Sequence, residues 1–145
     1  MLGCASPRDS LSTRDEAQRV AFEKGLVLLR ESGLKGPRPV CVATRFTRTR
    51  SGYEVEDPSA DLVNALRASH PLIRRGSDCT LTRYEAVRGA FGLSGALMWA
   101  EGVSPVGNRA IARIGYYVEP LYSAEFECVL QFREGEWRVT GCTLM

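Results

Sequence analysis

The chain has 145 residues, a formal net charge of +2, 44% hydrophobic residues and 25% charged residues. These values are ordinary for a globular domain long enough to build its own hydrophobic core. No block of like charge exceeds a local pair, which argues against a surface for nucleic acid or acidic lipid. The sequence contains no stretch of about 18 apolar residues, so no transmembrane helix is predicted. The basic stretch at Arg45, Arg48 and Arg50 is better explained by a solvated strand edge or loop than by a phosphate site.

The N-terminus, Met1-Leu2-Gly3-Cys4-Ala5-Ser6, has neither the charged region nor the apolar region of a complete signal peptide. Its Leu-Gly-Cys-Ala-Ser segment resembles the end of a bacterial lipobox, in which the cysteine becomes the lipidated first residue. We therefore interpret residues 1–12 as a flexible tether with Cys4 as a candidate lipidation site. A chance match to so short a motif is the alternative.

Residues 13–145 are expected to form one α+β domain with the element order α-β-α-β-β-β-β-β. A long helix is predicted from Glu16 to Ser32, because apolar residues recur there at helical spacing and Gly33 stands where a left-handed residue ends a helix. Its capping box is either Thr13 with Glu16 or Ser12 with Asp15.

The middle of the chain alternates strands with a second helix. Asp57-Pro58-Ser59 predicts a helix start, with Asp57 as the cap, and that helix ends near Ser69 before His70-Pro71. The strands and connections expected around it are a strand at 40–46, a hairpin arm at 52–55, a strand at 73–81, a loose segment at 82–95 and a strand at 96–103 that is buried on both sides or lies at an interface.

Three consecutive antiparallel strands are predicted between Ala110 and Thr143, and the rest of the domain is expected to fold against them. Apolar residues alternate with charged ones along each strand, which is typical of a sheet covered on one face only. The apolar face carries Ala112, Ile114, Tyr116, Val118, Phe126, Cys128, Leu130, Phe132, Trp137 and Val139.

A turn at Arg133–Glu136 sets the register of the last two strands, because it puts Phe132 opposite Trp137 and all apolar residues on one face. In that register Cys128 lies opposite Gly141. Cys142 then points away from Cys128, so we expect no disulfide between them and a free thiol at Cys142.

Several segments, taken in order, resemble uncharacterised bacterial secreted or lipoprotein-type domains of the NTF2-like and cystatin-like kind. The resemblance covers about residues 38 to 143 and depends on Val40-Cys41-Val42, Asp57-Pro58-Ser59, Arg75-Gly76-Ser77-Asp78-Cys79, Gly115-Tyr116-Tyr117, Pro120-Leu121-Tyr122-Ser123-Ala124 and Gly135-Glu136-Trp137-Arg138-Val139. It implies a curved antiparallel sheet wrapped around a long N-terminal helix. It implies no reaction, because this kind of fold hosts enzymes, binding proteins and scaffolds alike.

In the same resemblance Cys41 and Cys79 occur together, and a strand-helix-strand unit brings such positions within bridging distance. A disulfide between them would require an oxidising compartment. The alternative is two buried thiols that pack as small hydrophobic side chains. If the bridge forms, thiol counting should find three free thiols, and five would exclude it.

The sequence offers no catalytic constellation, cofactor motif or metal motif. The single histidine, His70, stands at a helix end, where pairing with the helix dipole is more common than general-base chemistry. No Cys-x-x-Cys pair indicates a zinc or thioredoxin-like site. An enzyme of the NTF2-like kind needs an inward-facing carboxylate, but Glu119, Glu125 and Glu127 fall on the charged face.

We therefore expect an exported, periplasmic or outer-membrane-anchored domain that binds a protein partner or small ligand and catalyses nothing. Candidate ligand-binding residues are Tyr116, Trp99 and Tyr117. The exposed sheet face with Arg113, Tyr117 and Arg138 is a candidate surface for a protein partner or a second copy. The alternatives are an isomerase- or hydrolase-like enzyme with a pocket in the sheet cone, and a cytosolic immunity-type accessory protein.

Overall fold

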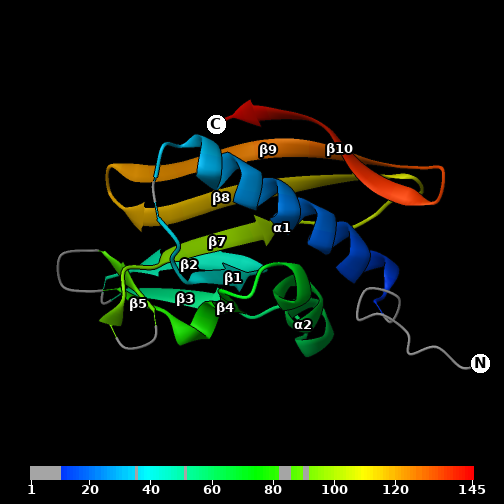
Figure 1. The fold of residues 1–145 in the computed structure, drawn as a ribbon. Helices are drawn as coiled ribbons and strands as arrows, with labels where there is room; N and C mark the ends of the chain where they lie inside the picture. Colours follow the sequence, from blue (N-terminus) through cyan, green and yellow to red (C-terminus); the bar gives the residue numbers. More distant parts are fainter. Residues whose placement is uncertain (1–10, 35, 51, 82–85, 90–91) are drawn as a thin grey trace, which may run out of the picture.

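A long N-terminal helix lies across a six-stranded sheet in this α+β chain (Figure 1). The computed structural model describes residues 11–34, 36–50, 52–81, 86–89 and 92–145. The helical elements are α1 (Thr13–Glu31), α2 (Ala60–Ser69) and the short 3₁₀ helix η2 (Gly76–Asp78). The strands are β1 (Val40–Ala43), β2 (Arg45–Thr49), β3 (Gly52–Glu56), β4 (Ile73–Arg75), β5 (Thr80–Leu81), β6 (Val87–Arg88), β7 (Ala96–Glu101), β8 (Arg109–Glu119), β9 (Tyr122–Arg133) and β10 (Glu136–Leu144).

Helix α1 begins after Ser12, whose side-chain oxygen accepts a hydrogen bond from the backbone N–H of Asp15 at 3.1 Å. The Ser12–Asp15 register is therefore the one used, and Thr13 is the first helical residue. The helix ends at Glu31, and Gly33 follows with φ of 89°, as a left-handed helix terminus predicts.

The main sheet has the strand order β10-β9-β8-β7-β1-β4. Strands β7 to β10 pair antiparallel, as expected, but β1 runs parallel to both β7 and β4. The expectation of a wholly antiparallel sheet was therefore wrong at this edge. The chain leaves β1, passes through β2, β3 and α2 and only then returns as β4, and a long crossover of this type produces parallel pairing.

The strand predicted at 40–46 divides at Thr44 into β1 and β2, and β2 pairs with β3 as a separate hairpin. The strand predicted at 73–81 also divides, because η2 interrupts it between β4 and β5. The second helix begins later than expected. Ser59, rather than Asp57, is its cap, and the Ser59 side chain accepts from the N–H of Leu62 at 3.1 Å. Asp57 instead accepts two hydrogen bonds from Ser77.

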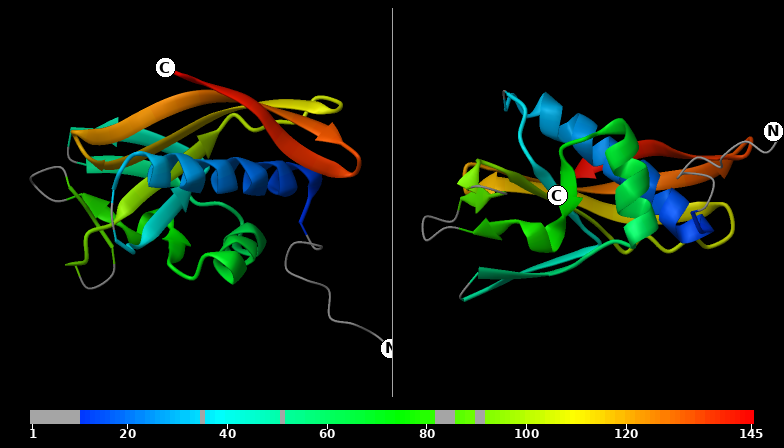
Figure 2. Two further views of the ribbon diagram at one scale, coloured as in Figure 1. Left: turned by 45° about the horizontal axis from the view of Figure 1, so that its top comes forward. Right: turned by 60° about the horizontal axis from the view of Figure 1, so that its bottom comes forward.

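Helices α1 and α2 cover one face of the sheet, and the main hydrophobic core lies between this face and the two helices (Figures 1 and 2). The alternation predicted for β8 places Ala112, Ile114, Tyr116 and Val118 on this face, and all four are buried in the core. The buried face of α1 also includes Gln18 and Gly25, which hydrophobic periodicity does not reveal.

The opposite face of the sheet is not fully open, which corrects the expectation of a sheet covered on one side. A second, smaller core lies there, where the β2–β3 hairpin packs over one end of the sheet. It buries Cys41, Ala43, Cys79, Val87, Leu97, Trp99 and Tyr117, with Phe46, Tyr53, Val55 and Leu81 packed against it. Sequence alternation describes each strand separately, so it does not show which face a distant hairpin will cover.

The pairing of β9 with β10 follows the predicted register only as far as Val139, which lies opposite Leu130. There a β-bulge shifts the register, so that Gly141 pairs with Val129 and Cys142 pairs with Cys128. The extra residue, Thr140, reverses the alternation beyond it and turns Cys142 to the side of Cys128. The two cysteines form a disulfide, with their Cα atoms 4.1 Å apart, and the prediction of a free Cys142 was wrong.

Candidate functional site

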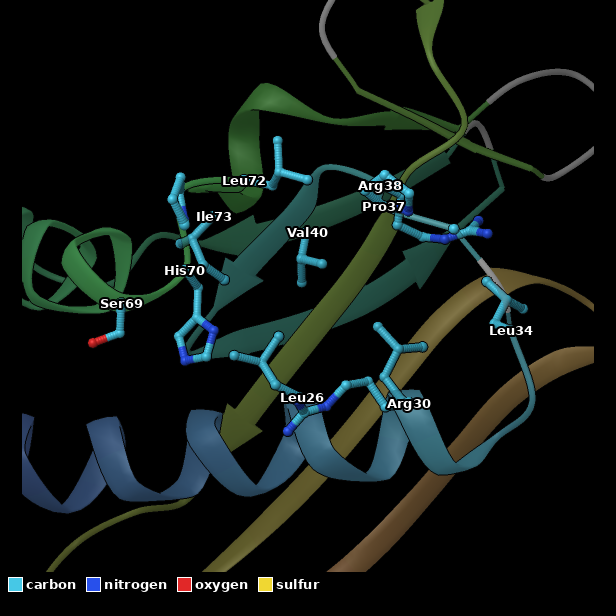
Figure 3. A pocket seen from close by; sticks show the side chains of 13 residues that line it. Leu26, Arg30, Leu34, Pro37, Arg38, Val40, Ser69, His70, Leu72 and Ile73 are labelled. Carbon is cyan, nitrogen blue, oxygen red and sulfur yellow. The ribbon is translucent and has the colours of Figure 1, made fainter.

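An apolar hollow lies between the C-terminal half of α1 and the β4 edge of the sheet, and we call it the α1–β4 pocket (Figure 3). Its volume is about 330 Å³, at the lower end of the range typical of small-molecule sites. The residues that line it are Leu26, Leu29, Arg30, Leu34, Gly36, Pro37, Arg38, Val40, Ser69, His70, Pro71, Leu72 and Ile73.

Three segments supply this lining because they converge at one edge of the sheet. Helix α1 contributes Leu26 and Leu29, one turn apart on the face toward the sheet, and Val40 begins β1. The end of α2 and its connection to β4 supply the opposite wall (Figure 3). Leu72 is 41% exposed and lies on this wall.

The polar part of the α1–β4 pocket is basic. Arg30 is exposed, and its side chain lies back along the helix toward Leu26 (Figure 3). Arg38 is half-buried and donates from Nη1 to the hydroxyl of Ser94 at 3.3 Å. Among the described residues that line the pocket there are two arginines and one histidine but no carboxylate. The two guanidinium groups therefore favour an anionic group near them, whereas His70 lies against the carboxylate of Glu23.

His70 stands at the C-terminal cap of α2 and connects the two helices. Its Nε2 lies 2.7 Å from Oε2 of Glu23 on α1. Glu23 also pairs with Arg19 on its own helix at 3.5 Å. A carboxylate that orients an imidazole is one part of a general-base arrangement, but within the described residues no serine, threonine or cysteine side chain is bonded to His70. The geometry is that of an interhelical contact at the edge of the pocket.

The three aromatic residues predicted to bind a ligand do not share one pocket. Tyr116 lies on the helix side of the sheet in the main core, whereas Trp99 and Tyr117 lie on the other face in the smaller core. All three are nearly buried, at 8%, 6% and 5% exposure. Strand neighbours such as Tyr116 and Tyr117 point to opposite faces, so they contact different layers.

Trp99 is held by a specific set of contacts on that face. Its indole lies over Gly115 of the adjacent strand and stacks on Phe46 of β2, with centroids 4.6 Å apart and planes at 11°. The indole N–H donates to Oε2 of Glu125 on β9 at 2.8 Å. Glu125 is thus a hydrogen-bond acceptor for the smaller core, rather than a free charge on the sheet surface.

The β2–β3 hairpin covers one of the three residues of the candidate partner surface, which are Arg113, Tyr117 and Arg138. The ring of Tyr117 is buried beneath Arg48, whose guanidinium carbon is 5.4 Å from the ring centroid. Arg113 and Arg138 remain more than half exposed, on β8 and β10, and each pairs with glutamates. Tyr117 therefore does not form an exposed surface with these two arginines.

Cys41 and Cys79 are joined by a disulfide that connects β1 to the residue after η2. With the Cys128–Cys142 bridge there are two disulfides, which indicate an oxidising environment. Four of the five cysteines are therefore bridged, so one free thiol is expected rather than three. The remaining cysteine, Cys4, and its proposed lipidation lie outside the described residues.

The part of the chain that the structure describes contains no cluster of three or more histidine, cysteine or acidic side chains able to hold a metal ion. In that same part, no helix is long and apolar enough to span a bilayer. Sequence reasoning missed most of the α1–β4 pocket. Arg30, Arg38 and Leu72 come from three separate connections or helix ends, and no spacing in the sequence relates them.

Comparison of the chain with models of known protein families, with curated proteins and with solved structures gave no match.

Proposed function

We propose that the α1–β4 pocket binds a small amphiphilic ligand with an apolar body and an anionic group. The observation that carries this proposal is the combination of an apolar interior with two arginines and with no carboxylate in the described lining. The apolar body would lie against Leu26, Leu29 and Val40. The anionic group would then lie near Arg30 and Arg38. This is the small-ligand form of the binding role expected from the sequence.

The proposal predicts how the affinity depends on the length of the ligand's apolar part. Each methylene that enters the pocket should contribute about 0.8 kcal/mol, which is about a fourfold gain in affinity. Straight-chain carboxylates of increasing length should therefore bind more tightly until the pocket is filled, and the gain should then stop. Isothermal titration calorimetry measures this series directly. Affinities that do not change with chain length would refute the proposal.

The anionic part is tested by changing the head group while keeping the chain. An alkyl trimethylammonium ion of the same length as the best carboxylate should bind more weakly, because it places a cation beside Arg30 and Arg38. Equal affinities for the two head groups would show that the arginines take no part in recognition.

A pair of leucines provides a matched test of the site. Leu72→Asp introduces a carboxylate at the pocket wall and should abolish binding of the carboxylate. Leu93→Asp makes the same change at a leucine that is 57% exposed and does not line the pocket, so binding should be unchanged. Binding that survives Leu72→Asp would place the ligand elsewhere.

A second candidate function uses the part of the outer sheet face that the hairpin leaves uncovered. Ile111 is 45% exposed there, beside half-buried Val129, and it is flanked by Arg113 and Glu127, which lie opposite each other on β8 and β9. Charges of both signs around an apolar centre suit contact with a second copy of the same face. We propose a weak homodimer through this face, which Ile111→Arg should shift to monomer in light scattering at increasing concentration.

The two disulfides support the further proposal that the chain is exported. They disfavour the cytosolic accessory protein. The lipobox-like sequence around Cys4 is the separate ground for proposing Cys4 as the chain's lipid anchor. Placement within the NTF2-like or cystatin-like group remains a proposal, supported by the long helix on β7–β10 and weakened by the parallel strands β1 and β4.

The enzyme alternative would need His70 and Glu23 as its base. Ester hydrolysis that is lost in His70→Ala would favour it over the binding role.

A further inference from the structure

A small polar pocket lies at the other end of the helical layer from the α1–β4 pocket, and the two share no lining residue. It forms where the first turns of α1 and α2 meet the end of β1, and α2 lies beside the N-terminal half of α1 (Figure 2). Its volume is about 130 Å³. The lining residues are Arg14, Asp15, Gln18, Thr44, Glu56, Asp57, Pro58 and Ser59.

Gln18 is the unusual member of this lining. Its side chain is 3% exposed, and Gln18 is the polar residue that α1 buries in the first turns of its sheet-facing side. Within the described part of the chain its amide makes no side-chain hydrogen bond, although one oxygen and two N–H groups are available. The amide lines the pocket, so a group that enters the pocket can bond to it in place of water.

The charges around Gln18 indicate which group this would be. Three carboxylates, from Asp15, Glu56 and Asp57, line the pocket with a single guanidinium, that of Arg14. Negative charge is therefore in excess, which favours a cation.

Each carboxylate already has a local partner. Asp15 accepts from the Ser59 hydroxyl at 2.6 Å, and Glu56 accepts from the Thr44 hydroxyl at 3.2 Å. Asp57 accepts from the backbone N–H and the hydroxyl of Ser77, at 2.9 and 2.6 Å. A carboxylate has about four acceptor positions. These three groups are thus held in place by the protein and keep acceptor capacity for a further donor.

We propose that this polar pocket binds the ammonium group of a small primary amine. The three N–H donors of such a group can be shared between the oxygen of Gln18 and carboxylate oxygens of the lining, and its positive charge offsets part of the excess negative charge. The carboxylates are not grouped as metal ligands among the described residues, which disfavours a divalent ion here. The proposal is independent of the ligand in the α1–β4 pocket.

The test uses methylammonium chloride as the probe and ¹H–¹⁵N spectra of the whole chain as the readout. Methylammonium should shift the side-chain amide resonances of Gln18 saturably, together with the backbone resonances of Thr44 and Asp57. Tetramethylammonium has the same charge but no N–H donor, so it should cause no saturable shift. If the two ions act alike, the effect is one of screening and the proposal is wrong.

Gln18→Met is the decisive variant, because methionine has nearly the same shape and no hydrogen-bonding amide. It should weaken methylammonium binding by about tenfold or more. Gln131→Met is the matched control, since it makes the same substitution at a glutamine on β9, away from the pocket.

Methylammonium binding should be unchanged in Gln131→Met. If Gln18→Met binds methylammonium as the wild type does, Gln18 is a structural residue and the site is refuted. If the wild type shows no saturable shift, the pocket holds water and the proposal is equally refuted.

Discussion

Gly115→Ala should be among the most damaging single-methyl additions in this protein, because the indole of Trp99 occupies the space where a Cβ would be. An ideal Cβ at Gly115 would lie 2.2 Å from Cζ2, 2.3 Å from Cε2 and 2.6 Å from Nε1 of Trp99. A fused ring system has no flexible end that could move aside. The indole must therefore leave its position over β8.

The cost follows from the contacts that the indole makes. Displacement breaks the hydrogen bond to Glu125, which as a bond to a charged group is worth about 1.5–3 kcal/mol, and the stacking on Phe46, worth about 0.5–1.5 kcal/mol. With the lost burial of the ring, we expect about 3–5 kcal/mol, as for removal of a core aromatic side chain. That is a large fraction of the stability of an ordinary domain.

Urea denaturation followed by circular dichroism measures this cost. A red shift of native-state tryptophan fluorescence, measured in a Trp137→Phe background, reports exposure of Trp99. Gly141→Ala on β10 is the matched control. A Cβ there meets nothing within 4 Å and the backbone is not left-handed, so the control should be neutral or slightly stabilising.

A double-mutant cycle isolates the cause. In a Trp99→Leu background the indole is absent, so Gly115→Ala should cost less than about 1 kcal/mol. The reasoning would be refuted if Gly115→Ala costs the same in both backgrounds, or if it is harmless in the wild type.

Burial, with a smaller contribution from the charge of Asp57, raises the pKa of Tyr53 to about 12. The stability that neutral Tyr53 contributes is therefore complete below pH 10, the pKa of an unfolded tyrosine, and is lost as the pH rises through 12. Stability measured over that interval should fall more steeply in the wild type than in Tyr53→Phe, and equal slopes would contradict this. Replacing Cys41 and Cys79 by alanine should cost about 4 kcal/mol and replacing Cys128 and Cys142 about 3 kcal/mol, because the first pair closes the longer loop. Urea midpoints in the reverse order would show that native-state contacts outweigh loop length. Thiol counting on the unfolded, unreduced chain should find one free thiol, or none if Cys4 is lipidated, and three would contradict the second bridge.

Local patterns in the sequence determined most of the individual elements. Helix α1, the buried strand β7 and the three long strands β8 to β10 were all predictable, because periodicity and turn chemistry depend on neighbours in the chain. The capping serine of α1 was one of two registers that the sequence left open. The apolar face of β8 followed from alternation alone. The resemblance to secreted domains also indicated the pair Cys41 and Cys79, which the structure joins.

The tertiary structure decided the features that depend on a β-bulge or on packing between segments far apart in the chain. The bulge at Thr140 reverses the alternation of β10 and creates the Cys128–Cys142 bridge, and no sequence pattern announces it. The hairpin of β2 and β3 covers Trp99 and Tyr117, and the parallel pairing of β1 arises from a long crossover.

The two pockets proposed as binding sites are also features that only the tertiary structure decided. Leu26, Arg38 and Leu72 are far apart in the chain, as are Gln18, Thr44 and Asp57, and each set meets only when the helices dock on the sheet. The sequence by itself determined the strands and helices because their causes are local. The surfaces on which this protein would act were determined only by the fold, because their causes are contacts between segments that the sequence keeps apart.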